Sequence, residues 1–139
     1  MPTRSTFPFG IQAAIAIIAA ATLSACATLA PQTPEQIVSQ RAQNYWDARI
    51  AGDKAKAYGF THPSYKQVYT EKDFGQQYPG TFAKSVTVKK VECDAEKCDV
   101  GINMRVVPPI IGNKMAEVDM YATETWLLAD GQWWIYIKP

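Results

Sequence analysis

The spacing of apolar residues changes from helical to alternating at about residue 81, and this change limits the fold more than any other feature. Before it, Thr33-Pro34-Glu35-Gln36 combines a capping residue, an early proline and a capping-box partner. This start predicts a helix from Pro34 to about Ala51, ended by Gly52. After residue 81, apolar and polar residues alternate as they do in strands. Helices followed by antiparallel strands predict an α+β domain.

Shorter helical segments are expected between the first helix and the strands. Asp53 can cap a helix from Lys54 to about Gly59. Ser64 to Tyr69 allows a further helical turn, because the preceding proline breaks the helix before it. Thr70 can start a last helix, which ends by Pro79-Gly80.

The second half of the chain carries signals for strand register. A break in phase at Lys89-Lys90 predicts a β-bulge, and Asp130-Gly131 predicts a two-residue hairpin. The core face of that hairpin would pair Leu128 with Trp133, Trp126 with Ile135, and Glu124 with Ile137. The other face of the hairpin would carry Trp134 and Tyr136, which are candidates for an interaction surface or for a homodimer contact.

The start of the chain resembles a bacterial lipoprotein signal. Residues 11–23 are almost unbroken apolar and follow Arg4, which is the pattern of an export signal. The segment ends in Leu23-Ser24-Ala25-Cys26, which resembles a lipobox, where the cysteine is acylated with chains such as palmitate and the chain is cut before it. This resemblance implies a signal peptide over 1–25, a lipidated tether over 26–33 and a folded domain over 34–139. Ala27, rather than Asp, after the cysteine favours the outer membrane, facing the periplasm.

Two alternatives remain open for this leader. Ala25-Cys26-Ala27 also fits an ordinary A-x-A cleavage site, which would release a soluble protein. No charge occurs from Ser5 to Pro34, so an uncleaved transmembrane helix is the second alternative. It is the weaker one, because the alanine-rich middle contributes little hydrophobic energy.

The numbers of charged and metal-binding residues exclude several classes of function. Lys plus Arg is 14 and Asp plus Glu is 13, which argues against a nucleic-acid partner. Three Cys and one His are too few for most metal or redox centres, so no metal or cofactor is expected. Cys93 and Cys98 flank a polar four-residue turn between strands, which predicts a disulfide in an oxidising compartment. A metal site and a redox pair fit this spacing less well.

Two segments, at the end of the first helix and at the last hairpin, carry motifs that resemble those of a known domain superfamily, the NTF2-like domains. Tyr45-Trp46-Asp47-Ala48-Arg49-Ile50-Ala51-Gly52-Asp53, followed by Ala57-Tyr58, looks like the opening of that superfamily, and Asp130-Gly131-Gln132-Trp133-Trp134-Ile135 looks like its last hairpin. The resemblance covers about Pro34 to Pro139. It implies a strongly curved antiparallel sheet wrapped around N-terminal helices, forming a cone with a pocket. A cystatin-like or other helix-on-sheet arrangement is the alternative.

Two charged residues interrupt apolar faces and are the leading site candidates. Arg49 falls within the apolar stripe of the first helix, where the resembled pattern has Leu, and Glu124 lies in phase with the apolar strand residues. A buried charge is costly without a partner, so these two indicate a buried ion pair or a polar cavity wall, unless each reaches solvent. Tyr45 and Trp126 are expected beside them as ligand-binding candidates. His62 and Glu124 are weak candidates for catalysis.

The loop Pro108-Pro109-Ile110-Ile111-Gly112-Asn113 is expected to leave the sheet, because prolines stop strand pairing. Ile110 and Ile111 would then cover the pocket mouth or meet a partner or membrane.

These observations favour a cell-envelope lipoprotein that binds a small apolar ligand or an envelope protein without catalysis. The alternative function is an NTF2-like enzyme that uses a cavity acid or base.

Overall fold

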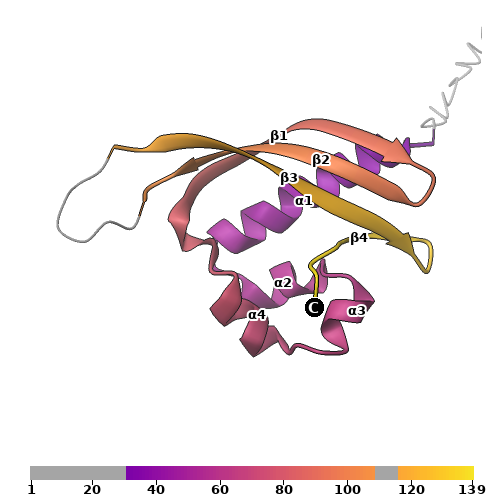
Figure 1. Ribbon diagram of the computed structural model, residues 1–139, viewed down its shortest axis with the longest axis horizontal. Helices are drawn as coiled ribbons and strands as arrows, with labels where there is room; N and C mark the ends of the chain where they lie inside the picture. Colours follow the sequence, from indigo (N-terminus) through magenta and orange to yellow (C-terminus); the bar gives the residue numbers. More distant parts are fainter. Residues whose placement is uncertain (1–30, 109–115) are drawn as a thin grey trace, which may run out of the picture. The chain divides into compact units, whose positions relative to one another are not determined.

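The computed structural model describes residues 31–108 and 116–139, which belong to one folded unit (Figure 1). The leader, Cys26, Ile110 and Ile111 lie outside these residues, so the predictions about them remain predictions. Within the described ranges, no helix is both long and apolar enough to cross a membrane.

The longest helix begins and ends at the residues that the sequence indicates. Helix α1 spans Pro34–Ile50, with a capping box between Thr33 and Gln36. Gly52 follows with a φ of +77°, a conformation that glycine adopts without steric cost. One stripe of α1 is buried, and it includes Arg49 among its apolar residues as expected: Val38, Ala42, Tyr45, Trp46, Ala48 and Arg49.

Three short helices follow α1. Helix α2 spans Lys54–Gly59 with Asp53 as its cap, and α4 spans Glu71–Gln77 with a capping box between Thr70 and Asp73. Helix α3 spans only Pro63–Lys66, so it starts earlier and is shorter than the expected turn at 64–69. His62 sets the start of α3, because its Nδ1 accepts the Ser64 N–H at 3.1 Å and so caps the helix. A 3₁₀ turn, η1, at Gly80–Phe82 leads into the sheet.

Four antiparallel strands form an open sheet in chain order: β1 Ala83–Asp94, β2 Lys97–Val106, β3 Val118–Ala129 and β4 Gln132–Ile135. The expected bulge is present between Val88 and Lys90. The expected hairpin register is also present, with Leu128 opposite Trp133 and Trp126 opposite Ile135. The proposed Glu124–Ile137 pair is not formed, because β4 ends at Ile135.

Helix α1 lies along one face of the sheet, and α2 and α4 lie near the C-terminal end of α1 (Figure 1). Helix α3 starts beside β4, where the His62 N–H donates to the Ile135 carbonyl. Trp126 is fully buried at the centre of this packing, with Tyr45 of α1 at an edge-to-face distance of 6.3 Å between ring centres. The arrangement is the expected α+β fold of helices packed on an antiparallel sheet.

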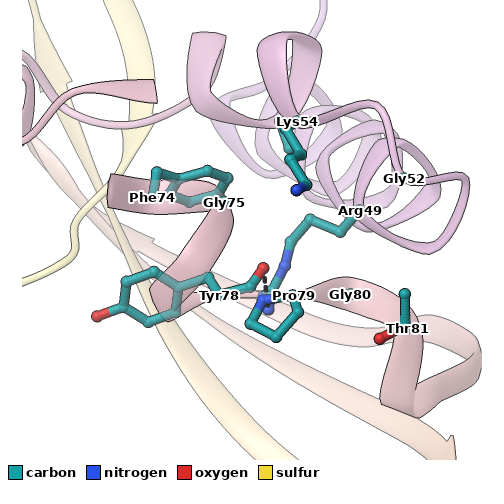
Figure 2. Close-up of a pocket in the computed structure, with 10 residues that line it drawn as sticks. Arg49, Gly52, Lys54, Phe74, Gly75, Tyr78, Pro79, Gly80 and Thr81 are labelled. Atoms are coloured by element: carbon teal, nitrogen blue, oxygen red, sulfur yellow. Dashed lines mark hydrogen bonds between the residues drawn. The ribbon is translucent and has the colours of Figure 1, made fainter. Parts of the chain in front are cut away.

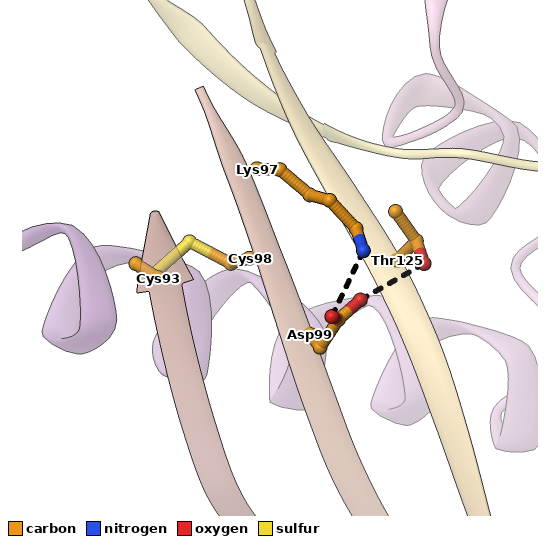
Figure 3. A network of polar contacts seen from close by, with 5 residues as sticks. All are labelled: Cys93, Lys97, Cys98, Asp99 and Thr125. Carbon is orange, nitrogen blue, oxygen red and sulfur yellow. Dashed lines mark hydrogen bonds and ion pairs between the residues drawn. A yellow bond between two sulfur atoms is a disulfide. The ribbon is translucent and has the colours of Figure 1, made fainter. Parts of the chain in front are cut away.

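A disulfide joins Cys93 and Cys98 at one end of the sheet, as the spacing predicts (Figure 3). The connecting turn is shorter than expected, because Asp94 still pairs with Lys97 and Ala95 takes a φ of +43°. On β2 and β3, Asp99 accepts hydrogen bonds from Lys97 Nζ at 2.9 Å and from Thr125 Oγ1 at 3.1 Å. The disulfide therefore joins β1 to β2, and the bond between Thr125 and Asp99 joins β2 to β3 near the same end of the sheet.

The far end of the sheet differs from the expected core face. Met120 and Val118 continue the apolar phase of β3 but are 49% and 38% exposed. Met120 lines an apolar surface with Phe82, Val106 and Pro108, and Val118 pairs with Val106 in the sheet. Among the described residues, no helix covers this end of the strand.

Candidate functional site

The site is built on three side chains that α1 presents at its C-terminal half. Tyr45, Trp46 and Arg49 are all buried. They share one face of the helix because Tyr45 and Trp46 each lie about one helical turn before Arg49. Across from them, β3 contributes Glu124 and Trp126. The structure thus brings together the four ligand-binding candidates that the sequence indicates: Tyr45, Arg49, Glu124 and Trp126.

Arg49 is surrounded by aromatic rings. Its guanidinium carbon lies 4.1 Å from the centre of the Trp46 ring and 5.3 Å from that of Tyr45. Attraction between a desolvated cation and such a ring contributes about 2 kcal/mol in favourable cases. The guanidinium also donates to the Tyr45 hydroxyl and to the Tyr78 carbonyl, both at 3.3 Å. These contacts stabilise a cation that is only 8% exposed.

Glu124 is held by two indole groups. The Nε1 atoms of Trp46 and Trp126 lie 2.7 and 3.5 Å from its two carboxyl oxygens, and both donate to it. Burial raises the pKa of Glu124 to about 7, although the two indole donors and the charge of Arg49 act in the opposite direction. Glu124 therefore changes its charge near neutral pH.

Arg49 and Glu124 do not form the direct ion pair that was one hypothesis. The ion pairs in the described part of the chain all involve other residues. Trp46 instead contacts both charges, because its ring faces Arg49 and its N–H points to Glu124. The side chains are close but are joined through an indole, which supports the second hypothesis, a polar cavity wall.

A cavity of about 370 Å³ lies beside these residues. Its polar groups include Glu124, Arg49 and Lys138, and its apolar wall comes from Ile135 and Ile137. Burial also raises the pKa of the Tyr45 hydroxyl, so this group stays protonated at neutral pH. Among the described residues, the lining is Tyr45, Arg49, Tyr78, Thr123, Glu124, Thr125, Ile135, Tyr136, Ile137 and Lys138.

Lys138 and Tyr78 were not expected at the site. Tyr78 arrives from the turn after α4, and Lys138 from the tail after β4. Neither interrupts a periodic pattern, so the sequence holds no local signal for them.

His62 does not line this cavity. Its ring caps α3 and contacts Ser64 Oγ at 2.8 Å, and it lies 6.2 Å from the Tyr136 ring. These contacts give His62 a structural role at the helix start. Among the described residues, no cluster of three or more His, Cys, Asp or Glu side chains could hold a metal ion.

The candidate interaction residues on β4 have different surroundings. Trp134 is half-buried, with Lys66 Nζ 4.6 Å and the Arg41 guanidinium 5.6 Å from its ring, and its N–H donates to the Ala129 carbonyl. Tyr136 is 39% exposed. Contact with a partner through this face remains a prediction.

Comparisons with known proteins identify the fold. A scan of protein-family models and a search of curated proteins both find no match to the sequence. Solved structures do match, at low sequence identity. An NTF2-like protein from Cytophaga hutchinsonii has a TM-score of 0.54 at 13% identity, over 75% of this chain and 93% of that one.

The second is a candidate NTF2-like transpeptidase from Campylobacter jejuni, with a TM-score of 0.50 at 11% identity, over 71% of this chain and 96% of that one. The third is a SEC-C motif containing protein from Rhodopseudomonas palustris, with a TM-score of 0.54 at 13% identity, over 76% of each chain. At these identities the likeness establishes the fold alone, and that fold is NTF2-like.

Proposed function

We propose that this chain is a lipid-anchored protein of the bacterial cell envelope, whose domain binds a small, mainly apolar ligand in the cavity beside Glu124 without transforming it. The observation that carries the binding role is the cavity itself. Its volume of about 370 Å³ falls in the range of small-molecule sites, and it combines apolar walls with a few converging polar groups.

The polar groups indicate what kind of ligand fits. Near neutral pH, Glu124 can either accept or donate a hydrogen bond, and the Tyr45 hydroxyl remains protonated. Ile135, Ile137 and Tyr136 offer an apolar surface to the rest of the ligand. A neutral molecule with one hydroxyl or amide group and a short apolar body matches this set.

The envelope location is supported by two independent features. The segment Leu23-Ser24-Ala25-Cys26 resembles a lipobox, and the folded domain carries a disulfide, which persists in oxidising compartments. Two acyl chains on Cys26, with a third on its amino group, would hold the protein stably on a bilayer. Ala27 after the cysteine favours an outer-membrane location, facing the periplasm.

An enzyme that uses Glu124 as a cavity acid or base is the second candidate function. The raised pKa of Glu124 favours it, because a general acid–base group works best when its pKa lies near the operating pH. Two observations weigh against it. Both carboxyl oxygens accept indole N–H groups, and no second Asp, Glu or His occurs in the described lining of the cavity.

The binding proposal is tested with full-length protein in nanodiscs, labelled with ¹⁵N at its tryptophan indoles, and titrated with 1-hexanol. We expect a saturable shift of the Trp46 and Trp126 indole signals, because both N–H groups contact Glu124 at the cavity, and no shift for Trp134. The variant Ile137→Trp should fill the cavity and abolish the shift. Val68→Trp is the matched control, because Val68 is 60% exposed and lies outside the cavity.

A shift that does not saturate, or that survives Ile137→Trp, contradicts the binding role. Turnover of hexanol esters or related substrates that is lost in Glu124→Gln would support the enzyme instead. The anchor is tested separately by labelling cells with a radioactive fatty acid. Wild-type protein should carry the label and Cys26→Ser should not, while a freely secreted, unlabelled product would refute the anchor.

A further inference from the structure

A second cavity, of about 130 Å³, also has Arg49 in its wall (Figure 2). It lies where the end of α1 meets α2, α4 and η1. In the described part of the chain, its lining includes two cationic side chains, Arg49 and Lys54, and no carboxylate. Around them lie apolar side chains and three glycines, and the described lining residues are Arg49, Gly52, Lys54, Ala57, Phe74, Gly75, Tyr78, Pro79, Gly80 and Thr81.

Arg49 lacks acceptors for its full set of donors. Its Nε–H is buried without a hydrogen-bond partner. The hydrogen bonds that its Nη1 and Nη2 atoms donate are both long, at 3.3 Å. No carboxylate of the described residues forms an ion pair with it. Aromatic rings attract the cation through their faces but do not replace an in-plane acceptor oxygen. A buried guanidinium in this state gains stability from any anion that reaches it.

Lys54 is placed over the same cavity by the absence of a side chain at position 75. A Cβ built on Gly75 would lie 2.6 Å from Lys54 Cδ and 3.3 Å from Cε, so the lysine stem lies directly across this glycine of α4. Figure 2 shows the Lys54 nitrogen on the side that faces Arg49. Two positive groups from different helices therefore meet at one cavity.

We infer that this cavity binds a small carboxylate anion, held by the guanidinium of Arg49 and the ammonium of Lys54. The guanidinium matches a carboxylate in its planar geometry, and Lys54 adds a point charge. Phe74 and Pro79 would contact the short apolar group of the anion. The small volume limits the ligand to molecules of about the size of acetate or propionate.

This site is a different cavity from the proposed ligand cavity, and the two share Arg49 and Tyr78 as a common wall. The positive charge of Arg49 lowers the pKa of Glu124, and a bound anion would offset that charge. Carboxylate binding should therefore raise the pH at which Glu124 ionises, and so couple the two cavities.

The test follows the Arg49 Nε–H signal of full-length ¹⁵N-labelled protein in nanodiscs, with sodium acetate or sodium propionate replacing sodium chloride at constant ionic strength. We expect a saturable shift of this signal. In Lys54→Met the affinity should fall about tenfold, which corresponds to the loss of one charge-assisted contact. Lys56→Met is the matched control, since Lys56 lies on the same helix, is exposed and does not line the cavity.

A second variant keeps both cations and changes only their placement. Gly75→Ala would push the flexible Lys54 stem aside, so we expect acetate affinity to fall while the fold is retained. In wild-type protein, acetate should also raise the titration midpoint of the Trp46 indole signal, a change that a purely structural role of Arg49 would not produce.

Several results would overturn the inference. One is an equal shift of the Arg49 Nε–H signal with sodium chloride alone, and another is a shift that saturates with neither carboxylate. Equal losses of acetate affinity in Lys54→Met and Lys56→Met would also overturn it, as would inorganic phosphate binding more tightly than acetate. The hexanol titration reads the two indoles that contact Glu124, whereas acetate affinity is read at the Arg49 Nε–H, so either proposal can fail without the other.

Discussion

At the scale of single residues, Trp46 explains how the buried cation of Arg49 and the partly buried acid Glu124 lie close without touching each other. The face of its ring lies against Arg49 and its N–H edge points to Glu124, so one neutral side chain stabilises a cation and an acid. The sequence marks both charges because each interrupts an apolar pattern. It does not mark the indole as the group that joins them, since a tryptophan on an apolar stripe looks like ordinary core.

The substitution Glu124→Gln should remove a pH dependence of stability. The pKa of Glu124 is about 7 in the folded protein against an ordinary 4.5, so the folded state binds this proton more tightly than the unfolded state. The stabilising contribution is complete below about pH 4.5 and is lost as the pH rises toward 7. In wild-type protein we expect a loss of at most about 3 kcal/mol from this group across that range.

Urea unfolding at several pH values measures this effect. The Gln variant should be less sensitive to pH and more stable than wild type above neutral pH, because an uncharged amide replaces a largely desolvated carboxylate. Its single oxygen can still accept the 2.7 Å bond from Trp46, and only the 3.5 Å contact with Trp126 loses its acceptor. Glu92→Gln is the control, because Glu92 is exposed and pairs only with Lys90 at the surface. A Gln variant that is less stable than wild type at alkaline pH would show that the carboxylate is favourable there.

At the scale of elements, Gly80 sets how closely η1 approaches the end of α1. A Cβ built on Gly80 would lie 2.1 Å from the Arg49 carbonyl oxygen and 2.3 Å from its carbon, and these are backbone atoms that cannot turn aside. Gly80→Ala should therefore destabilise the protein by about 2 kcal/mol or more. Gly59→Ala, where a Cβ meets nothing within 4 Å, should change stability by less than about 1 kcal/mol. Thermal unfolding of the two variants compares them, and equal stabilities would contradict this close approach.

Much of the element structure follows from local signals in the chain. The capping box at Thr33, the bulge before Lys90 and the Asp130-Gly131 turn all have a direct backbone cause, and the turn residues take φ values of +52° and +72°. The exposure of Met120 could not be foreseen, because alternation shows which face of a strand is apolar but not whether another element covers it. The same limit applies to Tyr78 and Lys138, which reach the cavity through tertiary packing alone.

At the scale of the whole molecule, the disulfide links the fold to the compartment in which it forms. Cys98 is completely buried and pairs with Trp126 across β2 and β3, so the bond closes the hairpin next to the centre of the core. A loop this short contributes about 2 kcal/mol when it is closed, mainly by limiting the unfolded chain. The proposed export and the stability of the domain are therefore coupled: protein held in a reducing cytosol should lack this contribution.

Trapping thiols in intact cells tests that coupling. Cells are quenched with acid, and the denatured protein is reacted with a maleimide that adds mass to each free thiol. In a Cys26→Ser background, exported protein should gain no mass, while a variant that also lacks residues 2–25 should gain two increments and unfold at lower urea concentration. Cys93→Ser/Cys98→Ser matches the reduced form in stability and should not respond to added reductant. Free thiols at both positions in the exported protein would contradict the proposed location, because an oxidising compartment would have closed a bond between cysteines that the fold already holds side by side.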